Sequence, residues 1–271
     1  MRPWVKLRST MWPYQLAMQA HIRTRGGLML FSPKATDPRR LYQQVADQIR
    51  QLIERGNYPP GARLPSERDL AIQLSVSRPS LREALIALEI QGRVEIRMGS
   101  GVYVCAMPAA DAADPLALGE SPSELMQARS VLEGAVIGLA AAQATRQGLE
   151  RVRASMDGMR QDVRRGQSPV DSDRRFHVAI AELTGNSILA RMVGELFDGR
   201  HGQIATRVSR GAETSRTWES ALQEHEKIYA ALEARDPQQA SAAMFNHLLA
   251  SKERWIEQAS GAGSDPSAQE R

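Results

Sequence analysis

Apolar residues in the first third of the chain recur at the spacing of a helix. Between residues 40 and 55 they fall at every fourth position and form one stripe, at Leu41, Val45, Ile49 and Ile53. A stripe with this period predicts an amphipathic helix. Gly56 and the Pro59-Pro60-Gly61 cluster that follows predict its end.

Two shorter helices follow, only a few residues apart. Ser66 is placed to cap the first of them, with Asp69 at the third helical position of a capping box. Ser77 is placed to cap the second, and Pro79 falls in its first turn, where a missing backbone N–H costs little. Gly92 ends this helix. The pattern predicts a helix-turn-helix.

Two short alternating runs come next and predict a β-hairpin, because the residues between them include two glycines. From residue 121 to about residue 260 the apolar period is helical throughout. The predicted fold class is therefore mainly α, an N-terminal winged helix-turn-helix followed by an all-α helical bundle. The predicted parts are a disordered basic extension (1–36), the winged helix-turn-helix (37–105), a linker (106–120), the bundle (121–260) and a disordered tail (261–271).

The net charge of +4 is unevenly distributed over the 271 residues. Residues 1–105 contain 16 Lys and Arg against 8 Asp and Glu, a charge of +8, whereas residues 106–271 contain 19 against 23, a charge of −4. A basic half joined to a mildly acidic half indicates a polyanion-binding module fused to a domain with another task.

The composition also restricts the compartment. Cys105 is the only cysteine, which excludes a disulfide framework and suits a reducing cytosol. No apolar run approaches the roughly 18 residues of a membrane span, so we expect a cytoplasmic protein without a membrane partner. The first 36 residues lack acidic side chains, and we interpret them as a silent extension or as the result of an upstream start, with Met29 as the alternative first residue.

Arginines cluster at the predicted helix-turn-helix. Arg78 and Arg82 lie four positions apart on one face of its second helix, and Arg68 begins the first. An Arg fork can bond two acceptors at once, on guanine or on phosphate, and Ser77 and Ser80 offer further donors to phosphate. Each arginine alone is equally consistent with a solvated surface. Together with the helix spacing and the hairpin, they predict binding to duplex DNA.

Residues 40–104 resemble the DNA-binding domain of the GntR superfamily of bacterial transcription regulators. The matching segments are Leu41-Tyr42-Gln43-Gln44-Val45, Pro60-Gly61, Leu64-Pro65-Ser66-Glu67-Arg68, Val76-Ser77-Arg78, Leu81-Arg82-Glu83-Ala84-Leu85 and Gly99-Ser100-Gly101-Val102. The resemblance implies DNA contacts by Arg68, Ser77, Arg78, Pro79, Ser80 and Arg82, and entry of Met98 and Gly99 into the minor groove. Pro79 departs from the family, where Thr is common, so a hydroxyl contact is lost there.

Three histidines of the second half have a suggestive spacing. Asp173 and His177 lie at i and i+4, on one face of a helix predicted over residues 171–183. We expect His225 to start a later helix and His247, 22 residues on, to end the next, so that an antiparallel pair would bring both imidazoles level. Three His and a carboxylate suit Zn²⁺ or another divalent transition metal. For any one His taken alone, a hydrogen-bonded core residue is the favoured interpretation.

Residues 121–258 are similar to the all-helical effector domain of FadR-type GntR regulators, called FCD. The similarity rests on Asp173-x-x-x-His177, on the spacings to His225 and His247, and on Ala181-Glu182-Leu183-Thr184-Gly185-Asn186. It implies a divalent metal, Zn²⁺ or else Ni²⁺ or Mn²⁺, held by Asp173, His177, His225 and His247, with a small carboxylate effector completing its coordination. It also implies that Arg129 reaches the same cavity. The other interpretation of Arg129 is a salt bridge with Glu133.

These inferences predict a homodimeric transcription factor rather than an enzyme, a repressor by default, which binds a palindromic operator and responds to an organic or sugar acid. The opening of the DNA-binding segment looks most like the hexuronate-type branch (UxuR and ExuR relatives), with lactate, galactonate and dicarboxylates as other effectors. A regulator that senses the metal itself is one alternative, and a zinc-dependent hydrolase is another. Against the hydrolase, we expect no further carboxylate near the ligands to act as a general base.

Overall fold

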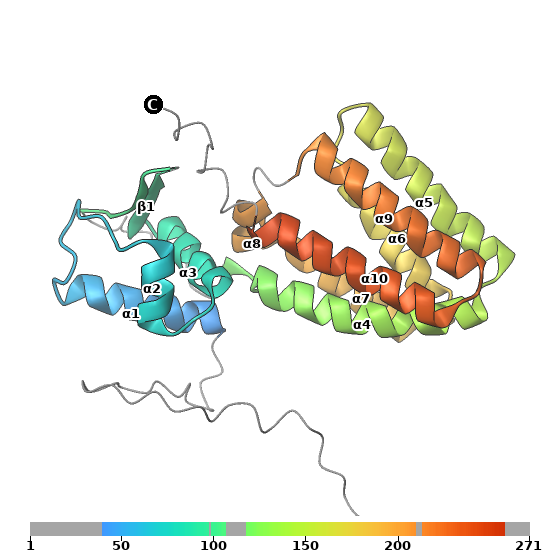
Figure 1. Ribbon diagram of the computed structural model, residues 1–271, viewed down its shortest axis with the longest axis horizontal. Helices are drawn as coiled ribbons and strands as arrows, with labels where there is room; N and C mark the ends of the chain where they lie inside the picture. Colours follow the sequence, from blue (N-terminus) through green and yellow to red (C-terminus); the bar gives the residue numbers. More distant parts are fainter. Residues whose placement is uncertain (1–39, 98, 107–117, 210–212, 258–271) are drawn as a thin grey trace, which may run out of the picture. The chain divides into compact units, whose positions relative to one another are not determined.

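The computed structural model describes residues 40–97, 99–106, 118–209 and 213–257 (Figure 1). The predicted basic extension and C-terminal tail, and most of the predicted linker, lie outside these residues. Residues 38–271 form one compact unit. Within it, the mainly helical fold class predicted from the sequence is confirmed.

The N-terminal part is a winged helix-turn-helix. Its elements are α1 (Leu41–Glu54), α2 (Glu67–Leu74), α3 (Arg78–Ile90), β1 (Val94–Arg97) and β2 (Gly101–Val104). The two strands pair antiparallel, with Val94 opposite Val104 and Arg97 opposite Gly101. An isolated bridge from Arg63 to Tyr103 extends the sheet by one residue. The predicted three helices and hairpin are thus present.

Serine caps fix where α2 and α3 begin. Ser66 Oγ accepts the backbone N–H of Asp69, and Ser77 Oγ accepts that of Ser80. The carboxylate of Asp69 accepts from the Ser66 hydroxyl at 2.6 Å, so the cap of α2 differs from the reciprocal capping box expected. Ser75 ends α2 with a φ of 56°. This left-handed residue makes the sharp turn between the two helices.

The C-terminal part is a bundle of helices. Its elements are α4 (Pro122–Gln143), α5 (Arg146–Arg164), α6 (Val170–Glu182), α7 (Ser187–Asp198), the 3₁₀ turn η2 (Gly199–His201), α8 (Gln203–Ser209), α9 (Ser215–Glu233), α10 (Pro237–Lys252) and the π-helical turn η3 (Glu253–Glu257). Helix α4 packs along α10, and α5 packs along α6 and α9 (Figure 1). Asn186 caps α7 by accepting two backbone N–H groups.

The bundle and the winged helix-turn-helix share part of their apolar packing. Ile204 and Val208 of α8 are buried in the same cluster as Leu81 and Leu85 of α3. Leu118, the first described residue after the gap, joins this cluster. Helix α8 therefore packs against α3 of the N-terminal part as well as against η2, η3 and α4 of its own part.

A buried carboxylate makes a second connection between the two parts. Glu83 of α3 accepts the hydroxyl of Ser121 at 2.7 Å and the backbone N–H of Ser123 at 2.9 Å. Burial raises the pKa of Glu83, and the two hydrogen bonds oppose that rise. Anionic groups are stabilised at a helix N-terminus, so Glu83 acts as an additional cap on α4.

Candidate functional site

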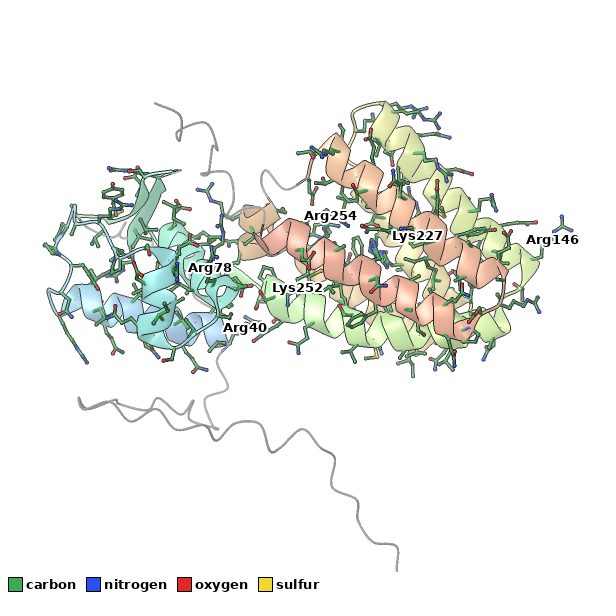
Figure 2. The ribbon with its side chains drawn as sticks, in the orientation of Figure 1. Arg40, Arg78, Arg146, Lys227, Lys252 and Arg254 are labelled. Carbon is green, nitrogen blue, oxygen red and sulfur yellow. The ribbon has the colours of Figure 1, made fainter. Side chains whose placement is uncertain are left out.

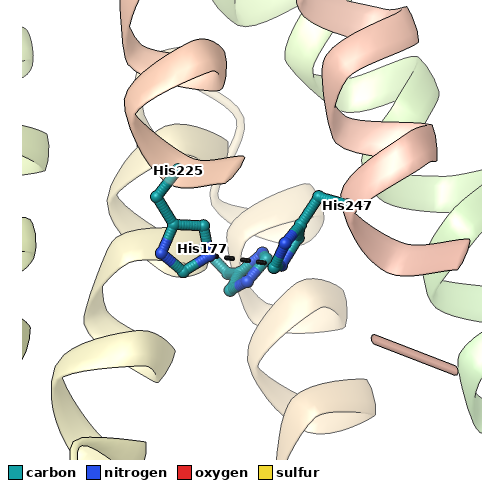
Figure 3. A group of neighbouring side chains, drawn as sticks. All are labelled: His177, His225 and His247. Carbon is teal, nitrogen blue, oxygen red and sulfur yellow. Dashed lines mark hydrogen bonds between the residues drawn. The ribbon is translucent and has the colours of Figure 1, made fainter. Parts of the chain in front are cut away.

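Three helices bring the predicted histidines together. Helix α6 carries Asp173 and His177 on one face, α9 carries His225 and α10 carries His247. Figure 3 shows the three histidines side by side. All four side chains are buried. His225 lies in the middle of α9 rather than at its start, because residues 215–220 are helical although they show no apolar stripe.

The facing atoms of these side chains have the spacing of a metal coordination shell. Nε2 of His225 lies 3.2 Å from Nε2 of His247, and Oδ1 of Asp173 lies 3.5 Å from Nε2 of both His177 and His225. The three His donors all lie within 4.8 Å of one another. Donors at about 2.0–2.2 Å from a tetrahedral Zn²⁺ stand about 3.4 Å apart. The measured distances match this value.

The hydrogen bonding of the cluster also fits a metal ion. Asp173 Oδ1 and His177 Nε2 are buried without a hydrogen-bond partner among the described residues. Buried polar atoms without partners are costly. Both atoms point to the same centre, so a divalent ion would satisfy them together. There it would supply a Lewis acid to which an anion could bind as a further ligand.

Carboxylates support the histidines from behind. Glu133 Oε2 lies 2.5 Å from His177 Nδ1, and Glu224 Oε2 lies 2.8 Å from His247 Nδ1. A metal-binding His usually donates its other N–H to such a carboxylate, which fixes the tautomer and orients the ring. Nδ1 of His225 is buried without a partner among the described residues, and its ring stacks on Phe176 at 4.1 Å. Both carboxylates bind ring nitrogens, so the expectation that no further carboxylate near the ligands acts as a general base stays a prediction.

The charges around the cluster set its protonation. Burial alone would raise the pKa of Glu133, but Arg129 and His177 lower it to about 2. Burial likewise opposes ionisation of Asp173, yet its His and Arg neighbours hold its pKa well below the usual range. Burial lowers the pKa of His225 and of His247. Ionised carboxylates and neutral imidazoles are the forms that bind a metal.

Three arginines line the cavity in front of the cluster. Arg129 lies there, as the resemblance implied, and its Nε also pairs with Glu133 at 2.7 Å, so both interpretations of this residue hold. Arg200 and Arg254 are the other two. Arg254 donates two hydrogen bonds to Glu224, from Nη1 to Oε1 at 2.6 Å and from Nη2 to Oε2 at 2.8 Å. No sequence pattern pointed to Arg200 or Arg254, because both lie in short turns (η2 and η3) without a legible period.

The predicted DNA-binding side chains gather at α2 and α3. Arg68, Ser77 and Arg78 are exposed, and Figure 2 labels Arg78 at the start of α3. Arg82 is only partly exposed, and its Nη1 lies 3.9 Å from Glu67 of α2. Arg82 therefore contacts the preceding helix, and its contact with DNA stays a prediction.

Pro79 and Ser80 lie at the start of α3. Pro79 occupies the first turn of α3, and the hydroxyl of Ser80 lies 2.8 Å from that of Ser77. Both residues are partly exposed on the same turn as Arg78. They lie where a phosphate could approach the helix N-terminus.

The hairpin places a second set of polar groups beside this surface. Gly99 is exposed with a φ of +70°, and Met98 lies outside the described residues. Arg97 pairs with Glu95 at 2.7 Å and lies over the ring of Tyr103 at 4.4 Å. Gly101 has a φ of +118°, and a Cβ there would stand 2.7 Å from Nε of Arg63. The sequence did not indicate Arg63, which the bridge to β2 brings to the wing.

One described helix, α4, is long and apolar enough to cross a membrane by length and composition alone. The sequence did not predict a membrane span, because it contains no unbroken apolar run of that length. Helix α4 meets the criterion through its mean hydropathy instead. Only 44% of its apolar window is buried in the structure. Core helices meet the same criterion, so α4 by itself carries no membrane assignment.

Comparison with known proteins gives two family matches and several relatives. The family model described as "Bacterial regulatory proteins, gntR family" matches residues 41–104, and the FCD domain matches residues 124–250. A protein named "Uxu operon transcriptional regulator" from Escherichia coli strain K12 is 36% identical over 82% of this chain and 90% of its own length. The "Exu regulon transcriptional regulator" of the same strain is 37% identical over 79% of this chain and 83% of its own length.

A solved structure titled "Streptococcus agalactiae GntR" is 25% identical, covers 78% of this chain and 99% of its own, and gives a TM-score of 0.43. The Uxu and Exu names agree with the resemblance to the UxuR and ExuR branch.

The metal cluster can be tested by titration with Zn²⁺ after treatment with a chelator. We expect His225→Ala to weaken Zn²⁺ binding by more than about 100-fold, and Glu224→Gln to weaken it by about 10–100-fold because the ring of His247 loses its support. Isothermal titration calorimetry measures both. The matched control is His201→Ala, since His201 is exposed and outside the cluster. Wild-type affinity in His225→Ala would refute this ligand set.

Proposed function

The chain belongs to the gntR family of bacterial regulatory proteins, with an FCD domain, and on this premise we propose that a small carboxylate bound at its metal centre controls its DNA binding. Members of the family are DNA-binding transcriptional regulators and not enzymes. The observation that carries the proposal is the pair of partnerless buried donors, on Asp173 and His177, that face an arginine-lined cavity.

The charge balance of the cavity supports an anionic effector. Three arginines, at 129, 200 and 254, stand against four carboxylates, at 133, 173, 213 and 224. The arginines and carboxylates alone sum to −1, and with a divalent ion and neutral imidazoles the cavity sums to +1. A carboxylate would thus be attracted more strongly to the loaded cavity than to the metal-free one. An arginine fork opposite the ion would orient it.

A sugar acid of the hexuronate type is the proposed effector, because relatives at 36% and 37% identity are named as Uxu and Exu regulators. A second candidate is lactate, since another relative, 31% identical, is named "Putative L-lactate dehydrogenase operon regulatory protein". Repression relieved by the acid is the proposed direction. The metal-sensing regulator remains the alternative, in which the ion alone changes DNA affinity.

The effector proposal predicts a response that needs metal and acid together. The DNA for this test is a duplex selected from a random-sequence pool for tight binding to the wild-type protein. With Zn²⁺ loaded, D-glucuronate, D-galacturonate or L-lactate should change its affinity by about 5–150-fold, the range of typical allosteric coupling. After chelator treatment the same acids should have no effect. An effect of Zn²⁺ alone, unchanged by any acid, would support the metal sensor instead.

DNA recognition is proposed to depend on the exposed face of α3. Arg78 is exposed at the N-terminus of α3, where recognition helices contact base edges and phosphates. Arg68 at the start of α2 and Gly99 at the hairpin tip flank it. A basic surface with a helix N-terminus at its centre favours polyanion binding.

Removal of the Arg78 guanidinium should weaken DNA binding while leaving the fold intact. We expect Arg78→Ala to reduce affinity for the selected duplex by about 1–3 kcal/mol, measured by fluorescence anisotropy at fixed salt. Arg146→Ala is the matched control, because Arg146 is a 94% exposed arginine at the first turn of α5 in the effector domain. Equal losses in both variants would mean that Arg78 contributes only general positive charge.

The proposed homodimer uses an apolar face of α4 and α7. Helix α4 exposes Val131 (70%) and Leu139 (52%), and α7 exposes Ile188 (57%) and Met192 (40%). The two helices pack against each other. Arg191 and Glu195 flank Met192 on the same helix. A two-fold axis there would cover the apolar residues with a second copy and set opposite charges across the interface.

One buried charge should disrupt such an interface. We expect Val131→Asp to shift the protein from dimer to monomer in analytical ultracentrifugation, because the carboxylate would be desolvated between two apolar faces. Ile72→Asp is the matched control, since Ile72 of α2 is equally exposed (69%) and lies off this face. A dimer that persists in Val131→Asp would place the interface elsewhere.

A further inference from the structure

The segment from Gly199 to Ser209, formed by η2 and α8, begins at the effector cavity. Arg200 of η2 has a side chain only 8% exposed. Its Nη1 lies 3.6 Å from Asp173 Oδ2, and its Nη2 lies 2.5 Å from Glu213 Oε1. The guanidinium also lies over the rings of Phe197 and Trp255, at 5.1 and 4.8 Å. Arg200 is therefore held most closely by Glu213 and also paired with Asp173, whose other oxygen faces the metal cluster.

The same segment ends against the recognition helix. Ile204 and Val208 of α8 are 0% and 3% exposed and lie in the apolar cluster of the winged helix-turn-helix. Arg207 binds Glu89 of α3 through Nε and Nη2, at 3.1 and 2.8 Å. The second oxygen of Glu89 accepts the backbone N–H of Ile96 in β1, at 3.0 Å. Glu89 thus joins α8 to both α3 and the wing.

The connection between these two ends is short and tightly packed. Ile204 lies only four positions after Arg200 in the sequence. Gly202, between them, ends the 3₁₀ turn η2 with an extended backbone. A Cβ on Gly119 would stand 2.9 Å from the Cα of Gly202, so this turn packs directly on the chain that leads into α4. Because this turn is short and packed, we expect a displacement of Arg200 to be passed on to α8.

We propose that η2 and α8 couple the effector cavity to the recognition helix, with Arg200 as the residue that reads the cavity and Arg207–Glu89 as the contact that passes its displacement to α3 and β1. The inference rests on the proposed function, because it needs an ion or anion in the cavity. An ion bound to Asp173 weakens the attraction of that carboxylate for Arg200, and an incoming carboxylate competes for the same guanidinium.

A second possible route runs through Glu83 and the start of α4. Both oxygens of Glu83 are satisfied by Ser121 and Ser123 in a buried site. The Arg207–Glu89 pair is more accessible, with side chains 42% and 16% exposed. It can therefore rearrange at lower cost, because water replaces lost hydrogen bonds at the surface. The variants that test the α8 route therefore change Arg200 or Arg207 and leave Glu83 intact.

Hydrogen–deuterium exchange of the full chain tests the coupling without an operator. The probes are Zn²⁺ alone and then Zn²⁺ with D-galacturonate. In the wild type we expect slower exchange at α6, α9 and α10, and a change at α3 and β1. In Arg207→Gln the effector-domain change should persist while the change at α3 and β1 falls to less than half. Arg200→Gln should bind Zn²⁺ and show the same loss at α3 and β1.

Arg146→Gln is the matched control, because Arg146 forms an exposed pair with Glu150 on α5, away from both ends of the segment. This variant should keep the wild-type response at every helix. A full response of α3 and β1 in Arg207→Gln and Arg200→Gln would overturn the coupling role. A wild-type response confined to α6, α9 and α10 would overturn it as well while leaving the proposed function in place. No response to Zn²⁺ or acid anywhere in the wild type would refute the proposed function itself, and the coupling with it.

Discussion

The burial of three imidazoles and a carboxylate at the centre of an apolar bundle is the constraint on which the C-terminal part depends. Leaving a buried polar atom unpaired costs roughly 1–3 kcal/mol. The chain meets this cost from behind with Glu133 and Glu224, each of which binds a ring nitrogen, and each of these carboxylates is in turn held by an arginine. At the front of the cluster, Asp173 Oδ1 and His177 Nε2 have no such partner among the described residues. This asymmetry makes the cluster a candidate ion site rather than a closed polar core.

The sequence predicts the part of this arrangement that follows a period. Asp173 and His177 share a face because a helix returns to it after four residues, and the structure places them so. His225 and His247 meet because α9 and α10 are joined by a short turn and pack together. Each of these inferences needs only local geometry, which explains why the helix over residues 171–183 was predicted nearly to its ends.

The groups that were not predicted are those that tertiary packing brings in. Glu133 lies 44 residues from His177 and was visible in the sequence only as a helical neighbour of Arg129. Arg200 and Arg254 are buried or nearly so, although arginine is normally a surface residue. Their burial follows from the fold, since phenyl and indole rings and paired carboxylates surround them. No spacing rule along the chain can reveal such a site.

The energetics of α8 determine what kind of signal can reach the recognition helix. Full burial of an Ile or Val side chain is worth about 1.5–3 kcal/mol, so Ile204 and Val208 together anchor α8 to the winged helix-turn-helix by several kcal/mol. Allosteric coupling energies are typically about 1–3 kcal/mol. An effector is therefore too weak to detach α8. In the proposed coupling it would instead shift α8 while these apolar contacts stay in place, and Glu89, bonded to both Arg207 and Ile96, would pass the shift to α3 and β1.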